Sequence, residues 1–349
     1  MMQLMQWVAA ALTAFAVFNG IMFLIYLPVN EITRSGGSSP GLKVYPDYGL
    51  YGLEGYAIRT VDSRGYVNPD LPLAHEPYLV VGASHAEGFH TANGRRYSDI
   101  LNERFGYTDS LKFYNISHSE FFLPDIVKRL SAMKKEFPDA KGLIIDIDST
   151  AADSRQLEDA MDQLGFDEAA DSYEALYSAL PAGKKAAYRI KALTPAIREM
   201  SLQYQTFMKS RSGMDLNVLR QEEDRQESSR EKQDRLEAYR ASMGETLEFM
   251  ASTWPDTIIV LHPGAVIDED GSLSIAKEDT DDIFEELCLE YGISVIDMTD
   301  RFERAYEEDH TVPFGFMNTT MGSGHMNDAA HRMIADAVYE MLDDRGDGI

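Results

Sequence analysis

Residues 78–88 read YLVVGASHAEG, and this stretch decides the fold that we predict. Its first four residues, Tyr78–Val81, form an apolar run of the length expected for a buried strand. Ser84 follows two small residues, at the point where a helix would begin. A sharp turn from strand to helix exposes such a serine, and its hydroxyl becomes nucleophilic once a base removes its proton. The stretch therefore predicts an α/β sheet with a nucleophilic serine at the end of its first strand.

Further apolar runs along the chain have the length of buried strands, and most are rich in valine and isoleucine. Segments with helical periodicity lie among them, near residues 97–105, 123–137 and 281–291. Strands that alternate with helices indicate a parallel sheet that is covered on both faces. We therefore predict a three-layer α/β/α fold with a five-stranded parallel sheet, whose remaining strands are Lys112–Ile116, Leu143–Ile147, Thr257–Leu261 and Ile293–Met298.

A histidine directly precedes the last predicted helix. Residues 324–331 read GHMNDAAH, and Asn327 can cap a helix that carries an apolar stripe from Met333 to Leu342. His325 stands two residues before this cap, and an imidazole is the base that a serine nucleophile needs. Ligands bind at the carboxyl ends of the strands in an open parallel sheet, so His325 and the serine are expected at the same edge.

Other polar residues follow the predicted strands and are candidate oxyanion or substrate residues. Asn115 and Glu120 follow the second strand, Ser149 the third and His262 the fourth, while His85 directly follows the nucleophile. Each has an alternative interpretation that involves no substrate. Asn115 can fix its loop through hydrogen bonds to the backbone, His262 can bond to the backbone, and His85 can be an exposed turn residue.

The motifs GxSxxxG at residues 82–88 and GHxN at residues 324–327 together resemble those of the SGNH/GDSL hydrolase family. The resemblance implies a flavodoxin-like α/β/α fold with a nucleophilic serine after the first strand and a catalytic histidine before the last helix. By this resemblance Ser84 is the nucleophile and His325 the general base.

The resemblance covers about residues 76–150 and 255–343, and residues 313–327 are also similar to membrane-anchored bacterial members. Such members often act on cell-envelope polysaccharides or on their acyl esters. The implied activity is therefore that of a membrane-anchored serine esterase or O-acyltransferase that acts on an acylated glycan through an acyl-serine intermediate.

Three positions depart from the pattern of the family. Gly322 stands where an aspartate usually precedes the histidine by three residues. Glu120 stands where a glycine usually offers its N–H to the oxyanion, and Ser149 stands at the usual asparagine. Either a Ser–His dyad operates with another group that orients the histidine, for which Asp309 and Asn318 are candidates, or the site is weakened or lost. The alternative to an enzyme is a degenerate envelope protein of the same fold, with a binding or assembly role and a membrane-bound partner.

The chain divides into five segments by composition. Residues 1–30 contain no Lys, Arg, Asp or Glu and are long enough to span a bilayer, so we predict an uncleaved transmembrane anchor and regard a signal peptide as the alternative. Residues 31–75 read as a tether and a segment that wraps the domain surface. Residues 76–150 and 251–345 are the two halves of the domain, and residues 151–250 form a charged helical insertion between them.

The side of the membrane is less constrained by the sequence. Arg34 and Lys43 follow the span and no basic residue precedes it, which by the positive-inside rule disfavours export of the domain. Two residues are a small bias, and the family resemblance points outward. We expect a single-pass protein of the cell membrane with its domain outside the cytoplasm, and keep a membrane-tethered cytoplasmic domain as the alternative.

Charge and cysteine content restrict the other function classes. The net charge of −26 leaves no basic stripe for phosphate backbones, so we expect no nucleic-acid partner. Cys288 is the single cysteine, which excludes an internal disulfide, and it is expected to pack in the core. The histidines show no metal-ligand spacing with acidic residues or with the cysteine, so we predict no metal and no other cofactor.

Overall fold

The structure is a computed structural model of the whole chain. It describes residues 2–346, and the segments left out of the description are 26–30, 33–41, 44–46, 52–53, 61, 63, 65, 120, 165–180, 195, 198–199, 201–203, 205–227, 269 and 320–321. Of the predicted site residues, Glu120 lies outside the described residues.

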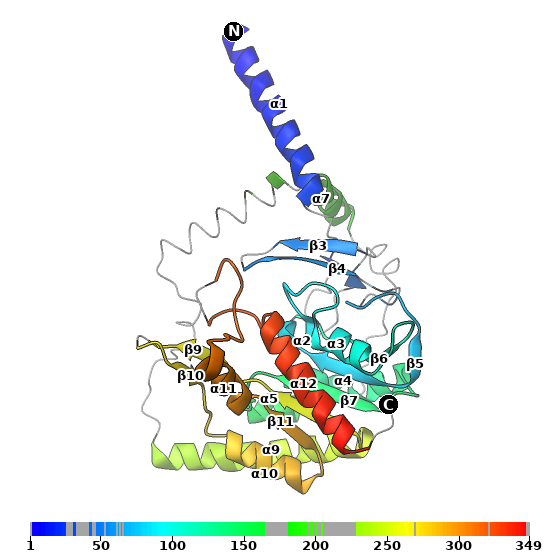
Figure 1. Cartoon of the computed structure of the whole chain (residues 1–349), viewed down its shortest axis with the longest axis vertical. Coiled ribbons are helices and arrows are strands. Elements are labelled where there is room, and N and C mark those ends of the chain that lie inside the picture. The colour runs from blue at the N-terminus through cyan, green and yellow to red at the C-terminus, as the bar shows by residue number, and fades with distance from the viewer. Residues whose placement is uncertain are drawn as a thin grey trace.

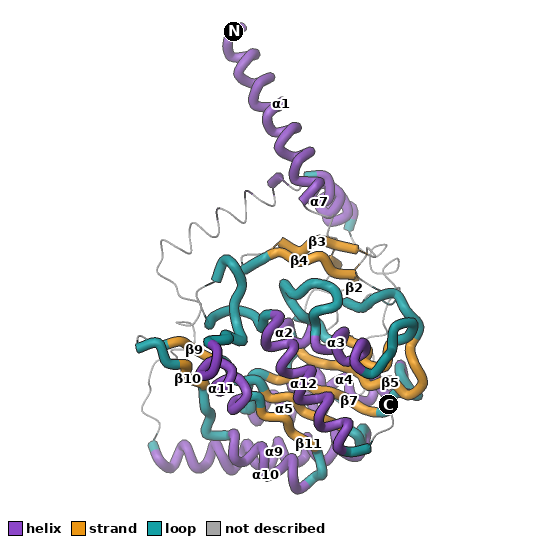
Figure 2. The backbone as a smooth tube through the Cα atoms, viewed as in Figure 1, coloured by secondary structure: helices purple, strands orange, loops and turns teal. Residues whose placement is uncertain are grey.

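A five-stranded parallel sheet forms the centre of the domain (Figures 1 and 2). Counted along the chain, its strands lie in the order 2-1-3-4-5, so the first strand has a neighbour on each side and the chain reverses its direction of progress there. The predicted fold class and all five predicted strands are confirmed. In spatial order the strands are β6 (Leu111–Asn115), β5 (Leu73–Gly82), β7 (Gly142–Ile147), β8 (Thr257–Leu261) and β11 (Ser294–Asp297).

Side chains that alternate along each strand supply two cores, one on each face of the sheet. Leu79 of β5 and Ile145 of β7 belong to one core, whereas their neighbours Val80 and Ile144 belong to the other. Both faces are therefore covered by apolar helix stripes. One face carries α4 (Leu123–Glu136), α5 (Ser154–Asp162), α9 (Ser229–Thr253) and α10 (Asp281–Glu290), and the other carries α2 (Ser84–Glu87), α3 (Tyr97–Arg104), α11 (Thr299–Asp309) and α12 (Asp328–Asp344).

The charged segment after β7 joins this core at its far end. A capping box at Ser228 starts α9, and the second half of the helix buries Tyr239, Met243, Leu247 and Met250 against the sheet layer. The boundary that we expected at residue 250 therefore falls inside a helix of the domain. The many charged residues in the first half of α9 made the whole helix resemble part of the charged insertion. Only the second half has a buried face.

Shorter elements surround the sheet. Two of them form an antiparallel hairpin that lies between the sheet and the N-terminal helix (Figure 1). The other two short pairs are also antiparallel. The hairpin consists of β3 (Asp47–Tyr51) and β4 (Tyr56–Thr60), and the other pairs are β1 (Glu31–Ile32) with β2 (Leu42–Lys43) and β9 (Ala265–Ile267) with β10 (Leu273–Ile275).

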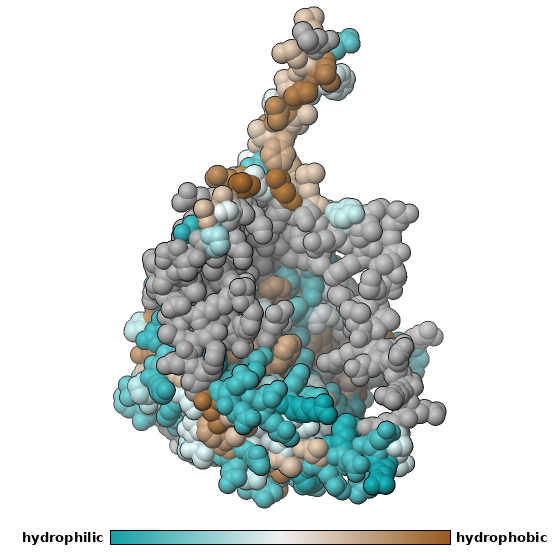
Figure 3. All heavy atoms as spheres, turned by 180° about the vertical axis from the view of Figure 1, so that it is seen from behind, coloured by the Kyte–Doolittle hydropathy of each residue, from teal (hydrophilic) through white to brown (hydrophobic). Residues whose placement is uncertain are grey.

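The N-terminal helix α1 (Met2–Ile25) projects from the domain beside α7 (Ala182–Leu193), and its surface is largely apolar (Figures 1 and 3). Its stretch Met2–Met22 is long and apolar enough to cross a membrane, and Met22 is its one buried residue. A signal sequence has the same properties.

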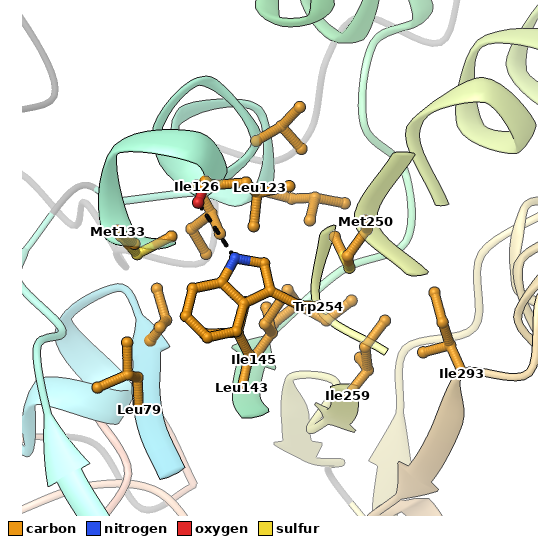
Figure 4. Close-up of a cluster of buried hydrophobic side chains, with 14 of the residues drawn as sticks. Leu79, Leu123, Ile126, Met133, Leu143, Ile145, Met250, Trp254, Ile259 and Ile293 are labelled. Atoms are coloured by element: carbon orange, nitrogen blue, oxygen red, sulfur yellow. Dashed lines mark hydrogen bonds between the residues drawn. The ribbon is translucent and has the colours of Figure 1, made fainter. Parts of the chain in front are cut away.

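Trp254 occupies the centre of the core that α4 and α9 cover (Figure 4). Its ring is fully buried, and its indole N–H donates a hydrogen bond to the carbonyl of Leu130 at 3.1 Å. The ring thus ties the end of α9 to α4 on the same face of the sheet.

We expect Trp254→Ala to lower the free energy of unfolding by about 3–5 kcal/mol, because it removes a large buried side chain and leaves a cavity. Trp254→Phe retains much of the volume but deprives the Leu130 carbonyl of its donor, so its effect is expected to be smaller. Urea unfolding followed by far-ultraviolet circular dichroism measures both, with Leu289→Ala as the control because Leu289 is 82% exposed. A Trp254→Ala variant as stable as this control would contradict the assignment.

Candidate active site

Three side chains from distant parts of the chain form a continuous hydrogen-bonded series. Ser84 begins α2, directly after the first strand, and its hydroxyl lies 3.0 Å from Nε2 of His325. On the other side of the imidazole ring, Nδ1 lies 2.8 Å from a carboxylate oxygen of Glu54. The second oxygen of Glu54 accepts the backbone N–H of His325 at 2.9 Å. One carboxylate therefore holds both the ring and the backbone of His325, and a hydroxyl faces the other ring nitrogen.

Glu54 takes the place of the aspartate that the sequence lacks. It lies in the turn between β3 and β4, and the amide N–H of Asn318 donates to its carbonyl at 3.0 Å. Asp309 does not orient the histidine, since its carboxylate accepts the N–H of Thr311. Asn318 contributes its backbone to holding the acid. The sequence signal for Glu54 is slight: residues 50–57 read LYGLEGYA, an acidic residue in an otherwise apolar and aromatic run.

Two glycines beside His325 explain why its carboxylate partner comes from a distant part of the chain. Gly324 has φ of +96°, and a Cβ there would lie 2.8 Å from a carboxylate oxygen of Glu54. Gly322, where an aspartate was expected, has φ of +81° and faces Ile267. A side chain at residue 322 would be strained, and one at residue 324 would displace Glu54.

The electrostatics of Glu54 favour its ionised form. Burial of the carboxyl group raises its pKa, but the hydrogen bond and the charge of His325 outweigh burial, and the net pKa is lowered. An ionised Glu54 accepts the proton of Nδ1, and this leaves Nε2 of the neutral ring without a proton. Nε2 can then accept the proton of the Ser84 hydroxyl.

A second buried ion pair holds the turn that carries the serine. Arg59 on β4 is fully buried and pairs with Glu87 at the end of α2, while its other guanidinium nitrogen donates to the carbonyl of Gly88 at 3.1 Å. Glu87 also accepts the N–H and the hydroxyl of Ser119, at 2.8 and 3.0 Å. The hairpin that supplies Glu54 thus also fixes the turn after β5 and the loop after β6.

His85 and His262 lie beside His325. The N–H of Met326 donates to Nδ1 of His85 at 3.1 Å, and the ring centroid of His85 lies 5.2 Å from that of His325 and 5.0 Å from that of His262. Burial lowers the pKa of His85 well below its usual range, and repulsion by His262 lowers it further. His85 is therefore neutral with its proton on Nε2.

His262 forms a buried pair with Asp146, at 2.7 Å between Nε2 and a carboxylate oxygen. Burial lowers the pKa of His262, but the charge of Asp146 and its hydrogen bond outweigh burial and raise it. The pair joins the ends of β7 and β8, and sequence reasoning placed His262 at this edge without identifying its partner.

The other two described candidates hold loops. Asn115 is buried, donates to the carbonyl of Ala86 at 2.7 Å and accepts the N–H of Ser117 at 2.9 Å. The hydroxyl of Ser149 donates to the carboxylate of Glu278 at 2.7 Å. Both residues lie at the predicted edge of the sheet, and their polar atoms bond to neighbouring loops.

His90 lies next to Glu54 and His325 and could act as a metal ligand. It is buried with φ of +66°, and Glu54, His90 and His325 each offer a ligand atom within 4.8 Å of the others. Burial lowers the pKa of His90 to about 4, so its ring is neutral. These three could hold a divalent metal only if the Glu54–His325 hydrogen bond were given up. That the protein uses no metal stays a prediction.

A cavity of about 440 Å³ opens next to Ser84. Ala83 and His85, the chain neighbours of Ser84, line it together with the Asp146–His262 pair. Its wall also contains aromatic and polar side chains from the start of α4, from the length of α5 and from the loop after β7, among them Phe121, Phe122, Asp148, Gln156, Asp159 and Gln163. The cavity lies where the sheet order reverses, next to the first and third strands.

No protein-family model and no curated protein matches the chain. Among solved structures, an alpha/beta hydrolase enzyme from the metagenome of Lake Arreo, Spain, is 13% identical over 77% of this chain and 95% of its own, with a TM-score of 0.39. The psychrotrophic esterase EstA from Pseudoalteromonas sp. is 9% identical over 78% and 99%, with a TM-score of 0.37. A member of the lipolytic protein G-D-S-L family from Veillonella parvula is 13% identical over 76% and 96%, with a TM-score of 0.35. At such identities and TM-scores, function is inferred from the geometry of the site alone.

The Asp146–His262 pair predicts a pH dependence of stability. The pKa of His262 is raised in the folded protein. The contribution of His262 to stability is therefore complete below about pH 6.5, the pKa of histidine in the unfolded chain, and it is lost as the pH rises through the folded pKa. We therefore expect the destabilisation caused by His262→Gln to be larger at about pH 5.5 than well above the folded pKa of His262. Urea unfolding across this range measures it.

His331→Gln is the matched control, because His331 is also fully buried and burial lowers its pKa to about 3. In the wild-type protein, the contribution of the neutral His331 to stability is lost as the pH falls through about 6.5. The destabilisation caused by His331→Gln is therefore expected to become smaller, not larger, at low pH. Equal trends for the two variants would contradict the charge assignment of His262.

Proposed function

We propose that the protein is a membrane-anchored serine esterase or O-acyltransferase that acts on acyl esters of cell-envelope polysaccharide through an acyl-Ser84 intermediate. The observation that carries the proposal is the series Glu54–His325–Ser84, in which both ring nitrogens of the histidine are engaged at 2.8 and 3.0 Å. A serine whose base is itself oriented by a carboxylate is the arrangement required for nucleophilic attack on a carbonyl.

In the proposed reaction the Ser84 hydroxyl gives its proton to Nε2 of His325 as Oγ bonds to the ester carbonyl carbon. The carbonyl oxygen becomes an oxyanion, and Glu54 stabilises the imidazolium that has formed. As the oxyanion collapses, the C–O bond to the sugar breaks, and His325 returns the proton to the departing sugar oxygen. Water, or a second hydroxyl, then attacks the acyl-serine with His325 again as the base, which gives hydrolysis or acyl transfer.

The oxyanion donors follow from which N–H groups are already engaged. In the loop after β6, the N–H of Ser117 donates to the side-chain oxygen of Asn115. The N–H of His118 donates to the carbonyl of Gly82, and that of Ser119 donates to the carboxylate of Glu87. We therefore assign the oxyanion to the N–H of Ser84, with the proton on Nε2 of His85 as the neighbouring donor. Ser149 is a poor donor for this purpose because its hydroxyl already bonds to Glu278.

The lining of the cavity supports a polyhydroxylated substrate. Phe122, which is 51% exposed, offers an apolar face, while Asp148, Gln156 and Asp159 offer carboxylate and amide oxygens that accept hydroxyl protons. Neutral sugars present both apolar faces and hydroxyl groups. The acidic lining is poorly suited to an anionic substrate.

We expect a fluorophosphonate probe to label the wild-type protein and not Ser84→Ala, because the probe bonds to the activated serine. Glu54→Gln is expected to lower kcat for an activated acetyl ester on the order of 10³–10⁴-fold, since an amide no longer holds the ring in the required tautomer. Labelling followed by gel fluorescence, together with steady-state kinetics, measures the two effects.

Asp309→Asn is the matched control, because it makes the same acid-to-amide change at an exposed residue that does not contact His325. Labelling that is unaffected by Ser84→Ala would refute the nucleophile and favour a binding or assembly role. Full activity in Glu54→Gln with Ser84-dependent labelling would leave the nucleophile and refute the role of Glu54.

We further propose that α1 anchors the domain at the outer side of the cell membrane. The length, apolarity and exposure of Met2–Met22 support an anchor, and a glycan substrate of the envelope supports the outer side. Alkaline phosphatase fused after Ile349 is expected to be active and green fluorescent protein fused there to be dark. The reverse result would place the domain in the cytoplasm.

A further inference from the structure

An exposed apolar stripe runs along α7 and the helical residues that follow it. Its five side chains are separated by three and four residues in alternation, two of them at the end of α7 and three in the helical residues after Thr194. Between 51% and 66% of each residue is exposed, which is unusual for such large apolar groups. The stripe consists of Ile190, Leu193, Ile197, Met200 and Tyr204.

The stripe is fastened to the end of the apolar helix α1. The side-chain amide of Asn19 donates to the carbonyl of Leu193, the last residue of α7, at 2.9 Å, and its oxygen accepts the N–H of Ala196 at 3.1 Å. Ala196 and Met22 are also buried together. Asn19 thus satisfies a carbonyl at the end of one helix and an N–H at the start of the next.

This attachment fixes the depth of the stripe in a membrane. If Met2–Met22 spans the bilayer, Asn19 lies in the last turn of the span, at the boundary between hydrocarbon and headgroups. Leu193 and Ala196, which bond to Asn19, are then at the same depth. Figures 1 and 3 show α7 beside this end of α1 and apolar residues gathered at the junction.

The charge of the segment differs from that of the rest of the chain. Residues 182–204 contain five basic residues and one acidic residue, in a chain whose net charge is −26. An apolar stripe together with basic residues is the composition of helices that lie in the interface of anionic bilayers.

We infer that residues 182–204 lie in the plane of the membrane and bind an anionic lipid surface through this stripe. The inference rests on the proposed anchoring by α1 and adds a second point of attachment. Two attachments hold the hairpin of β3 and β4, which supplies Glu54, on the membrane side of the domain (Figure 1).

The test uses the full chain with a single reactive cysteine in the stripe. Ile197→Cys and Met200→Cys, each labelled with bimane, are compared with Leu289→Cys on α10, a control at a more exposed apolar residue away from α1. Burial raises the pKa of Cys288 to about 12, so this thiol stays unlabelled, which labelling of the wild-type chain verifies. The protein is reconstituted into phosphatidylcholine vesicles with and without phosphatidylglycerol, and flotation is recorded separately.

We expect blue-shifted emission and quenching by spin-labelled lipid at residues 197 and 200, stronger with phosphatidylglycerol, and neither effect at residue 289. Flotation without quenching at residues 197 and 200 would overturn the inference while the anchor stands. A blue shift that spin-labelled lipid does not quench would also overturn it, because another protein surface then covers the stripe. Equal quenching without phosphatidylglycerol would overturn the requirement for anionic lipid, and failure to float would refute the anchor and the inference with it.

Discussion

The carboxylate of Glu54 bonded to both the backbone and the ring of His325 is the interaction on which the rest of the site depends. It joins the start of the domain to a residue 271 positions later, and it fixes the direction in which the imidazole faces Ser84. The bonds require an unusual backbone, because Gly324 must adopt a positive φ and must lack a Cβ for the carboxylate to approach. The usual position of the acid is closed by the same loop geometry, since Gly322 is also left-handed.

Two buried ion pairs surround this interaction and hold the loops that carry it. Arg59 and Glu87 connect the hairpin to the turn after β5, and Asp146 and His262 connect the ends of β7 and β8. Buried pairs of this kind add little net stability, because desolvation of both charges opposes their attraction. Their effect is on geometry: each charge is costly unless its partner is in place, so few alternative loop arrangements are compatible with burial.

The strands were predictable because their signal is local. The apolar runs of the first four central strands are buried completely or nearly so, and Tyr78–Val81 alone identifies the first, whereas β11 at the edge is only partly buried. The extent of α9 was not predictable in the same way. Its first turns are solvated and charged, whereas Tyr239 to Met250 pack on the sheet, so composition alone drew the boundary of the domain through a continuous helix.

The sequence by itself determined the sheet, the position of Ser84 after its first strand and the position of His325 before its last helix. These depend on apolar runs, on caps and on residue spacing, all of which are local properties of the chain. Only the tertiary structure decided which carboxylate meets His325 and which partner meets His262. Glu54 lies in a segment without periodicity, and Asp146 lies within an apolar strand, so neither has a local signal that names its partner. Contacts between residues far apart in the chain are set by how the elements pack, because a carboxylate becomes a partner only when folding brings it within hydrogen-bonding distance and removes the competing water.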